Sequence, residues 1–311
     1  MRKGAVVSIR HLKAPALALG LASMVFSQVG EENLRELVHP PFVFRFPEPM
    51  RADVLHLAER GGVLLPRIAL DLGASIPRRI DVRLQTVPDP VRNGRAVPDW
   101  AAGFVPRGTT MIVIVRNRLG SYPLIEIESV FLHELTHVLF NFTLGSRSAQ
   151  IPRWFEEGVA MLQSRRWGFR DAFVLSASQF SGTNLPLEAL ATRFPSRQGA
   201  ARAAYAQSFS FMGYLTRKHG EEVPRRILGR VREGIDFPAA FHEVTGRGIA
   251  DAERAWRESV VWKYRWIPIL TSNGLLFSGI GILFLLSYLR KKRQTRRTLE
   301  SWGRFDPPDL F

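Results

Sequence analysis

The residues best suited to chemistry are the histidines and the glutamate of His133-Glu134-Leu135-Thr136-His137. On a helix, positions four apart lie on one face, so both imidazoles can bind one metal ion. Glu134 is the next residue round the helix and can reach a water molecule beside that metal. The alternative is two histidines on an ordinary helix face beside a solvated glutamate. The pattern predicts a metal site with a general base.

A second acidic segment, PRWFEEG, follows this motif after a short loop. A helix beginning near Pro152 would offer Glu156 or Glu157 as a third ligand and leave a fourth position open, as catalytic zinc sites do. The chain contains no cysteine, so thiolate ligands, cysteine nucleophiles and disulfides are excluded. Histidine and carboxylate ligands suit zinc, and we expect one Zn²⁺ ion.

The elements that must position these residues are predicted from apolar spacing and from proline and glycine. Strands are expected at Phe42–Phe46, Ile80–Thr86 and Thr110–Val115. Helices are expected over Ala52–Leu72 (broken by Gly61, Gly62 and Pro66, and ended by Gly73), Ile127–Phe142, from Pro152, Ala200–His219 (ended by Gly220), Pro224–Glu233 and Asp251–Trp266. The strand Thr110–Val115 is placed so that an extended substrate could pair along a sheet edge. Early strands and late helices predict the α+β class.

Apolar segments next to basic residues lie near both ends of the chain. Ala14–Phe26 follows a basic leader, which predicts a signal peptide over residues 1–27 or an uncleaved N-terminal anchor. Trp266–Leu289 carries no charge and as a helix would measure about 36 Å, against the roughly 30 Å of a hydrocarbon core. The basic run that follows predicts a transmembrane helix with a cytoplasmic tail over 290–311.

The net charge of +15 invites a nucleic-acid interpretation until the charge is located. Residues 1–27 hold four basic residues and no acid, and residues 290–311 hold seven basic and three acidic residues. Over half of the excess therefore lies at the ends, where it suits membrane topology and anionic lipids. We expect no nucleic-acid partner, and the sequence leaves the oligomeric state open.

Longer segments allow comparison with known families. They are HELTHVLF, PRWFEEGVAML and AAYAQSFSFMGYLTRKHG, with Trp100-Ala101-Ala102-Gly103 upstream and Thr245-Gly246 to Trp256 downstream. Over about residues 100–256 the chain resembles the peptidase MA-like gluzincins, relatives of thermolysin and the zinc aminopeptidases. The resemblance implies a zincin-like fold, zinc ligands at His133 and His137, and a catalytic base at Glu134. The Gly-x-Met-Glu-Asn motif is absent, which argues against an amine-capturing exopeptidase.

The resemblance also bears on the remaining site residues. Aminopeptidase-type spacing would choose Glu156 as third ligand, whereas thermolysin-type spacing and the Glu-Gly context choose Glu157, which we expect. Met161 stands where thermolysin-like sites carry an aspartate that orients a ligating histidine, so that partner must come from elsewhere or from the backbone. Hydrolysis of a peptide bond develops negative charge on the carbonyl oxygen, and a nearby phenol or imidazole can stabilise this oxyanion. Tyr205 is the first candidate for this role, and His219 is the second.

These inferences predict a zinc metallopeptidase anchored in the cell membrane. Its zincin-like domain, residues 28–265, would hydrolyse peptide or protein substrates outside the cytoplasm, and residues 266–289 would span the membrane. The alternative is a noncatalytic membrane-tethered binding or scaffold module with the same fold. Such a module would be expected to lack Glu134 or a ligand, and the sequence retains all of them.

Overall fold

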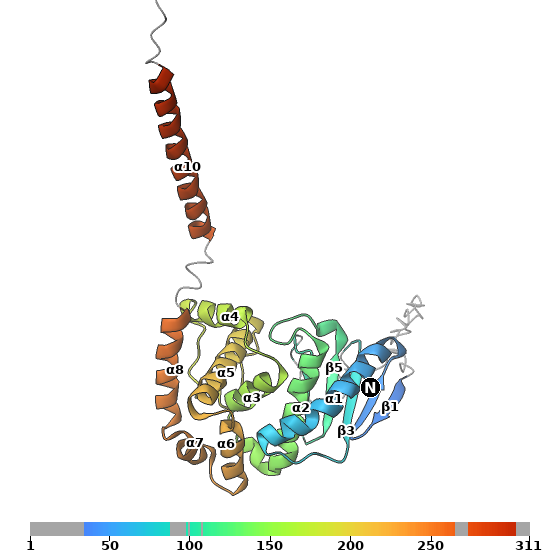
Figure 1. Ribbon diagram of the computed structural model, residues 1–311. Coiled ribbons are helices and arrows are strands. Elements are labelled where there is room, and N and C mark those ends of the chain that lie inside the picture. The colour runs from blue at the N-terminus through green and yellow to red at the C-terminus, as the bar shows by residue number, and fades with distance from the viewer. Residues whose placement is uncertain (1–33, 88–97, 99, 107, 265–272, 303–311) are drawn as a thin grey trace, which may run out of the picture. The chain divides into compact units, whose positions relative to one another are not determined.

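The computed structural model describes residues 34–87, 98, 100–106, 108–264 and 273–302. The strands are β1 (Arg35–His39), β2 (Phe42–Phe46), β3 (Ile80–Gln85), β4 (Gly103–Phe104) and β5 (Met111–Val115). The helices are α1 (Arg51–Leu72), α2 (Ile127–Leu144), α3 (Arg153–Ser164), α4 (Phe169–Phe180), α5 (Gln198–His219), α6 (Val223–Arg232), α7 (Phe237–Thr245), α8 (Ile249–Tyr264) and α10 (Asn273–Trp302), as labelled in Figure 1. Strands come first and helices dominate the remainder, so the α+β class is confirmed.

The sheet is mixed, with strand order β1-β2-β3-β5-β4. Strands β2, β3 and β5 run parallel, and β1 and β4 pair antiparallel at the two edges. Alternation along β2 buries Phe42 and Phe44 completely on one face. There the ring of Phe131, on α2, lies 5.5 Å from that of Phe42 and 6.1 Å from that of Phe44. These aromatic contacts seat α2 on the sheet.

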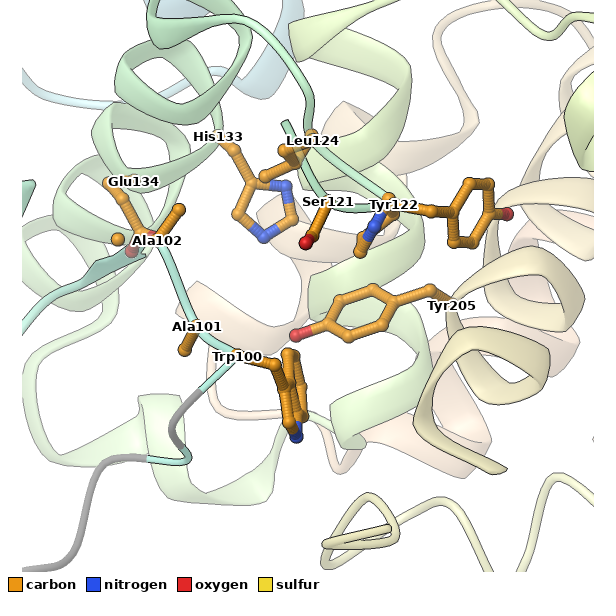
Figure 2. A pocket seen from close by; sticks show the side chains of 11 residues that line it. Trp100, Ala101, Ala102, Ser121, Tyr122, Leu124, His133, Glu134 and Tyr205 are labelled. Atoms are coloured by element: carbon orange, nitrogen blue, oxygen red, sulfur yellow. The ribbon is translucent and has the colours of Figure 1, made fainter. Parts of the chain in front are cut away.

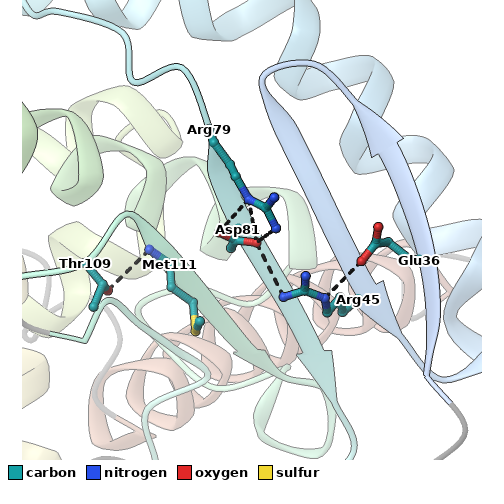
Figure 3. A network of polar contacts seen from close by, with 6 residues as sticks. All are labelled: Glu36, Arg45, Arg79, Asp81, Thr109 and Met111. Atoms are coloured by element: carbon teal, nitrogen blue, oxygen red, sulfur yellow. Dashed lines mark hydrogen bonds and ion pairs between the residues drawn. The ribbon is translucent and has the colours of Figure 1, made fainter.

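The other face of β2 and β3 carries charged residues. Arg45 donates to Glu36 at 3.1 Å, and Arg79 donates to Asp81 at 2.8 Å (Figure 3). Arg45 also lies 3.5 Å from Asp81, so the pairs join three adjacent strands. Partly exposed ion pairs of this kind contribute little to stability.

Helix α1 was expected to break at its glycines and proline, and this expectation is wrong. The helix is continuous over 22 residues with Pro66 inside it. A Cβ added to Gly61 would lie 2.9 Å from the ring of Phe131 and 3.0 Å from that of Phe42. The glycine therefore allows close packing that offsets the local cost of the proline. The predicted end at Gly73 is confirmed, since its φ of +59° forms a left-handed cap.

The sheet edge beside the motif is formed by β4 and not, as expected, by the strand over Thr110–Val115. Gly103 and Phe104 pair with Ile114 and Val113, which covers the end of β5. The two residues of β4 are too few to give an alternating pattern in the sequence. This edge of the sheet therefore belongs to β4.

Among the described residues, none of the helices combines the length and apolarity needed to cross a membrane. The structure thus gives no support to the predicted transmembrane helix Trp266–Leu289. Residues 266–272 of that segment, and the predicted signal peptide 1–27, lie outside the described residues. The described helix α10 begins at Asn273 and continues past Leu289 through the basic run.

Candidate functional site

The motif residues lie on a helix that is buried along most of its length. The exposed fractions of His133, Glu134 and His137 are 3%, 6% and 7%. Burying ionisable groups is costly unless they are paired or bind a metal. Apolar residues on the rest of α2, including Phe131 and Leu135, pack into the core and fix the turn of the helix that carries the two histidines.

The structure brings together His133, His137 and Glu157, all buried. The two Nε2 atoms are 3.2 Å apart. Glu157 Oε2 lies 3.0 Å from His133 Nε2 and 3.5 Å from His137 Nε2. One cation between these atoms would satisfy two imidazole nitrogens and a carboxylate at once. This donor set fits zinc with an open coordination position.

Glu156 makes a different contact from its neighbour Glu157. Its Oε1 lies 2.8 Å from Nδ1 of His137, the ring nitrogen that faces away from the shared point. A carboxylate there fixes the orientation and tautomer of a ligating imidazole. Although burial opposes protonation, Glu156 and Glu157 raise the pKa of His137 well above its usual value. The same negative charge favours a bound metal cation.

The other histidine has no such support. Nδ1 of His133 is buried and has no hydrogen-bond partner among the described residues. Met161 is fully buried at the position where thermolysin-like sites carry an orienting aspartate. A thioether cannot replace that carboxylate, which agrees with Nδ1 of His133 having no partner in the described part of the chain. The orienting contact in this chain therefore goes to His137 and comes from Glu156.

Arg153 is a site residue that sequence analysis missed. Its Nη2 lies 2.6 Å from Oε1 of Glu157, one helical turn away, while Oε2 faces the imidazoles. Burial would raise the pKa of Glu157, but Arg153 and then His137 hold it well below its usual range. The spacing of four residues between an arginine and an acid was the signal available in the sequence.

Glu134 points toward the edge strand. A Cβ added to Gly103 would lie 2.9 Å from both Cγ and Oε1 of Glu134 and 2.6 Å from Val130, so only glycine fits there. Burial raises the pKa of Glu134 above its usual value, in spite of the neighbouring His137. A carboxylate with a raised pKa is a better proton acceptor at neutral pH.

A cleft opens beside this carboxylate, between the β4 segment and the loop that precedes α2. Its lining comprises Trp100, Ala101, Ala102, Gly103, Ser121, Tyr122, Pro123, Leu124, His133, Glu134 and Tyr205. Figure 2 shows the hydroxyl of Tyr205 directed into the cleft, on the side of Trp100 and Ala101. The Tyr205 ring lies 6.2 Å from that of His133. Burial, and then Glu157, raise the pKa of Tyr205 well above 10, so its hydroxyl stays protonated and can donate.

The second oxyanion candidate does not join the site. His219 is the last residue of α5, about 21 Å along the helix from Tyr205 at 1.5 Å per residue. Burial and the cations Lys218, Arg247 and Arg226 lower its pKa. His219 therefore belongs to the far end of the helix.

Gly158 explains how α3 brings Glu157 to the imidazoles. A Cβ added to Gly158 would lie 2.5 Å from Cγ of Met212 and 2.6 Å from the carbonyl oxygen of Ser208, both on α5. The glycine lets α3 and α5 pack closely, which sets the rotation of α3. The same contact brings α5, which carries Tyr205, against the helix that carries Glu157.

Comparison with known proteins adds a family. The model of the peptidase MA superfamily matches residues 64–262. Aminopeptidase A of Legionella pneumophila, solved with aspartic acid, is similar at 14% identity and a TM-score of 0.43, over 72% of this chain and 28% of that one. An M1 zinc metallopeptidase mutant of Deinococcus radiodurans, bound to a Tyr-Ser-Ala substrate, is similar at 16% identity and a TM-score of 0.42, over 75% of this chain and 51% of that one. The chain thus spans less than two thirds of either enzyme, and no curated protein matches it. The family match covers more than half of the sequence, and the chain belongs to the peptidase MA superfamily.

Proposed function

We propose that this protein is a zinc-dependent peptidase in which His133, His137 and Glu157 hold one zinc ion. The observation that carries the proposal is the convergence of two Nε2 atoms and one carboxylate oxygen within 4.8 Å of one another, in a buried site beside Glu134. Zinc bound there would polarise the scissile carbonyl and acidify the attacking water. In the sequence the two histidines come first and the Glu-Gly pair follows on the next helix, an order that supports the same assignment.

The chain's own residues supply the proton transfers and the charge stabilisation. Glu134 accepts a proton from the attacking water and passes it to the leaving amine as the peptide bond breaks. The hydroxyl of Tyr205, kept protonated by its raised pKa, donates a hydrogen bond to the developing oxyanion. Glu156 holds His137 in position through Nδ1.

The test is zinc content and proteolysis of the wild type and the Glu134→Gln variant. We expect one zinc per chain in both proteins. The wild type should cleave an unstructured protein, and the variant should be at least about 10²-fold less active. Glu126→Gln, at the N-terminus of α2, is the matched control and should retain activity. Stoichiometric zinc without Glu134-dependent cleavage of any substrate would favour the noncatalytic scaffold instead.

We propose further that the peptidase domain acts outside the cytoplasm and is anchored through residues 266–289. The apolar segment followed by six basic residues supports this proposal. In the described part of α10, apolar side chains such as Phe277, Phe284 and Leu286 are more than half exposed. A reporter fused after Phe311 should be cytoplasmic while protease added from outside reaches the domain. A reporter on the outer side would refute this topology.

A further inference from the structure

A second hollow adjoins the catalytic cleft. It is lined by Trp100, Asn117, Arg118, Leu119, Ser121 and Gln198, and holds about 620 Å³ of open space. Trp100 and Ser121 also line the cleft beside Glu134. The two spaces therefore share walls and lie next to each other along the molecule.

Contacts of Tyr122, the residue after Ser121, hold this wall of the hollow in place. Tyr122 is 3% exposed, and its hydroxyl donates to Oδ1 of Asp171 at 2.9 Å. Figure 2 shows this hydroxyl directed away from Tyr205. Arg165 donates to Oδ2 of the same carboxylate at 2.7 Å and lies 5.6 Å from the centre of the Tyr122 ring. A buried, charged network of this kind fixes the wall before any substrate binds.

The wall that contains Trp100 is held by hydrogen bonds to backbone carbonyls and by a ring contact. Its indole Nε1 donates to the carbonyl of Ser196 at 3.2 Å, and its ring meets Tyr205 edge-on at 6.1 Å. Arg118 donates to the carbonyls of Pro98 and Ala101 at 3.0 and 3.3 Å. Both walls are therefore preorganised, which lowers the cost of ordering a bound chain.

The charges in the lining select among substrates. Within the described lining of both hollows the sole carboxylate is Glu134, which the proposed reaction uses as its base. A free substrate α-ammonium group would need a further acidic partner when it leaves water. Asn117, Gln198 and Ser121 are neutral and suit peptide backbone and uncharged polar side chains. Arg118, the cation in this lining, donates to the backbone carbonyls of Pro98 and Ala101.

We propose that the two hollows form one cleft for an extended peptide, so that the protein cleaves internal peptide bonds, with an uncharged polar side chain of the substrate in the second hollow. This inference rests on the proposed hydrolytic function. It predicts that binding energy from residues remote from the scissile bond contributes to the rate.

The test uses the full-length zinc-loaded chain and two kinds of substrate. One is an internally quenched octapeptide, acetylated and amidated, with serine, asparagine or glutamine at successive positions. The other is a set of aminoacyl amides with free amines. We expect cleavage of the octapeptide at an interior bond, located by mass spectrometry, with kcat/KM at least about tenfold above any short amide.

Variants separate the second hollow from general damage. The double variant Asn117→Ala/Gln198→Ala should lower kcat/KM for the octapeptide more than for the amides. Tyr122→Phe keeps the ring but removes the hydroxyl that binds Asp171, and should raise KM for the octapeptide more than it lowers kcat. Asp81→Asn, in the distant sheet network, is the control with unchanged kinetics (Figure 3).

Binding gives a readout that does not depend on turnover. The Glu134→Gln protein should bind the octapeptide, and the Asn117→Ala/Gln198→Ala pair should weaken this binding about fivefold or more. Unchanged affinity would overturn the second hollow as a subsite. Cleavage confined to short amides with free amines would overturn the proposal and leave the peptidase standing. Loss of all Glu134-dependent cleavage would instead refute the proposed function itself.

Discussion

Glu156 and Glu157 are adjacent in the chain, yet they contact opposite sides of one imidazole. Successive side chains on an α-helix point about 100° apart, so adjacent acids cannot face the same point. Glu157 faces the Nε2 atoms of both histidines, whereas Glu156 reaches Nδ1 of His137. The two carboxylates therefore have separable effects on a bound metal.

Replacing each acid by glutamine should reveal this separation, because both variants lose one negative charge. We expect Glu157→Gln to abolish stoichiometric zinc binding, since a ligand is lost. Glu156→Gln should weaken zinc binding by about 10–100-fold, as the loss of an orienting partner does. Competition with a chromophoric chelator measures both affinities. Equal losses of zinc affinity would contradict the assignment, and a greater loss in Glu156→Gln would reverse it.

The hydroxyl of Tyr205 can be tested without disturbing its ring. Tyr205→Phe should lower kcat by about 10²-fold, since one oxyanion donor is removed, while zinc content stays stoichiometric. Tyr214→Phe is the matched control on the same helix, because the Tyr214 hydroxyl contacts Lys218. Steady-state kinetics with wild-type kcat in Tyr205→Phe would remove this residue from the mechanism.

At the scale of the elements, the site depends on how closely α3 packs on α5. Gly158→Ala should lower the free energy of unfolding by about 1–3 kcal/mol, because the new methyl group would overlap Met212 and the backbone of Ser208. Its zinc affinity should fall as well, since α3 must move. The control is Gly229→Ala in α6, where an added Cβ would meet nothing within 4 Å. This substitution should be neutral or stabilising by up to about 1 kcal/mol. Denaturant unfolding distinguishes them, and equal stabilities would contradict the packing argument.

A second contact between elements ties α1 to the start of α2 and should respond to pH. Burial opposes ionisation of Glu128, but hydrogen bonds from Arg60 and then His56 outweigh it and lower its pKa below its usual value. A lowered folded-state pKa means that the stabilisation is present above the unfolded pKa of about 4.3 and is lost as the pH falls through the folded value.

The corresponding prediction concerns Glu128→Gln. At pH 7 this variant should be less stable than the wild type by up to about 1 kcal/mol, a discounted figure because the pair is partly exposed. The difference should shrink as the pH falls below the unfolded pKa of about 4.3 and vanish below the folded value. Urea unfolding at several pH values measures it. A difference that grows toward low pH would show that the sign of the shift is wrong.

At the scale of the whole molecule, the proposed zinc ion would join α2 to α3 through ligands 20 and 24 residues apart in the sequence. A ligand that binds only the folded state stabilises it by about 2.7 kcal/mol at a hundredfold excess over its Kd. Removing zinc with a chelator should therefore lower Tm by roughly 5–10 °C for a domain of this size. Glu134→Gln should keep this shift, because Glu134 is not a proposed ligand, and Glu157→Gln should lose it. A chelator-independent Tm in the wild type would refute a structural contribution from the metal.

The sequence alone predicted the features that depend on neighbouring residues. Helical spacing placed His133 and His137 on one face, and Gly73 and Gly220 marked helix ends. Alternation located the strand Phe42–Phe46 with correct bounds. These features are local because backbone periodicity and end-capping involve residues a few positions apart.

Tertiary structure decided what depends on the rotation and distance between elements. Which of the two adjacent acids faces the imidazoles follows from the rotation of α3, which Gly158 sets against α5. The continuity of α1 across Pro66 and the choice of β4 as the sheet edge follow from packing on Phe131 and pairing with β5. Such contacts join residues tens of positions apart, so the free energy that selects them is absent from any short stretch of the chain.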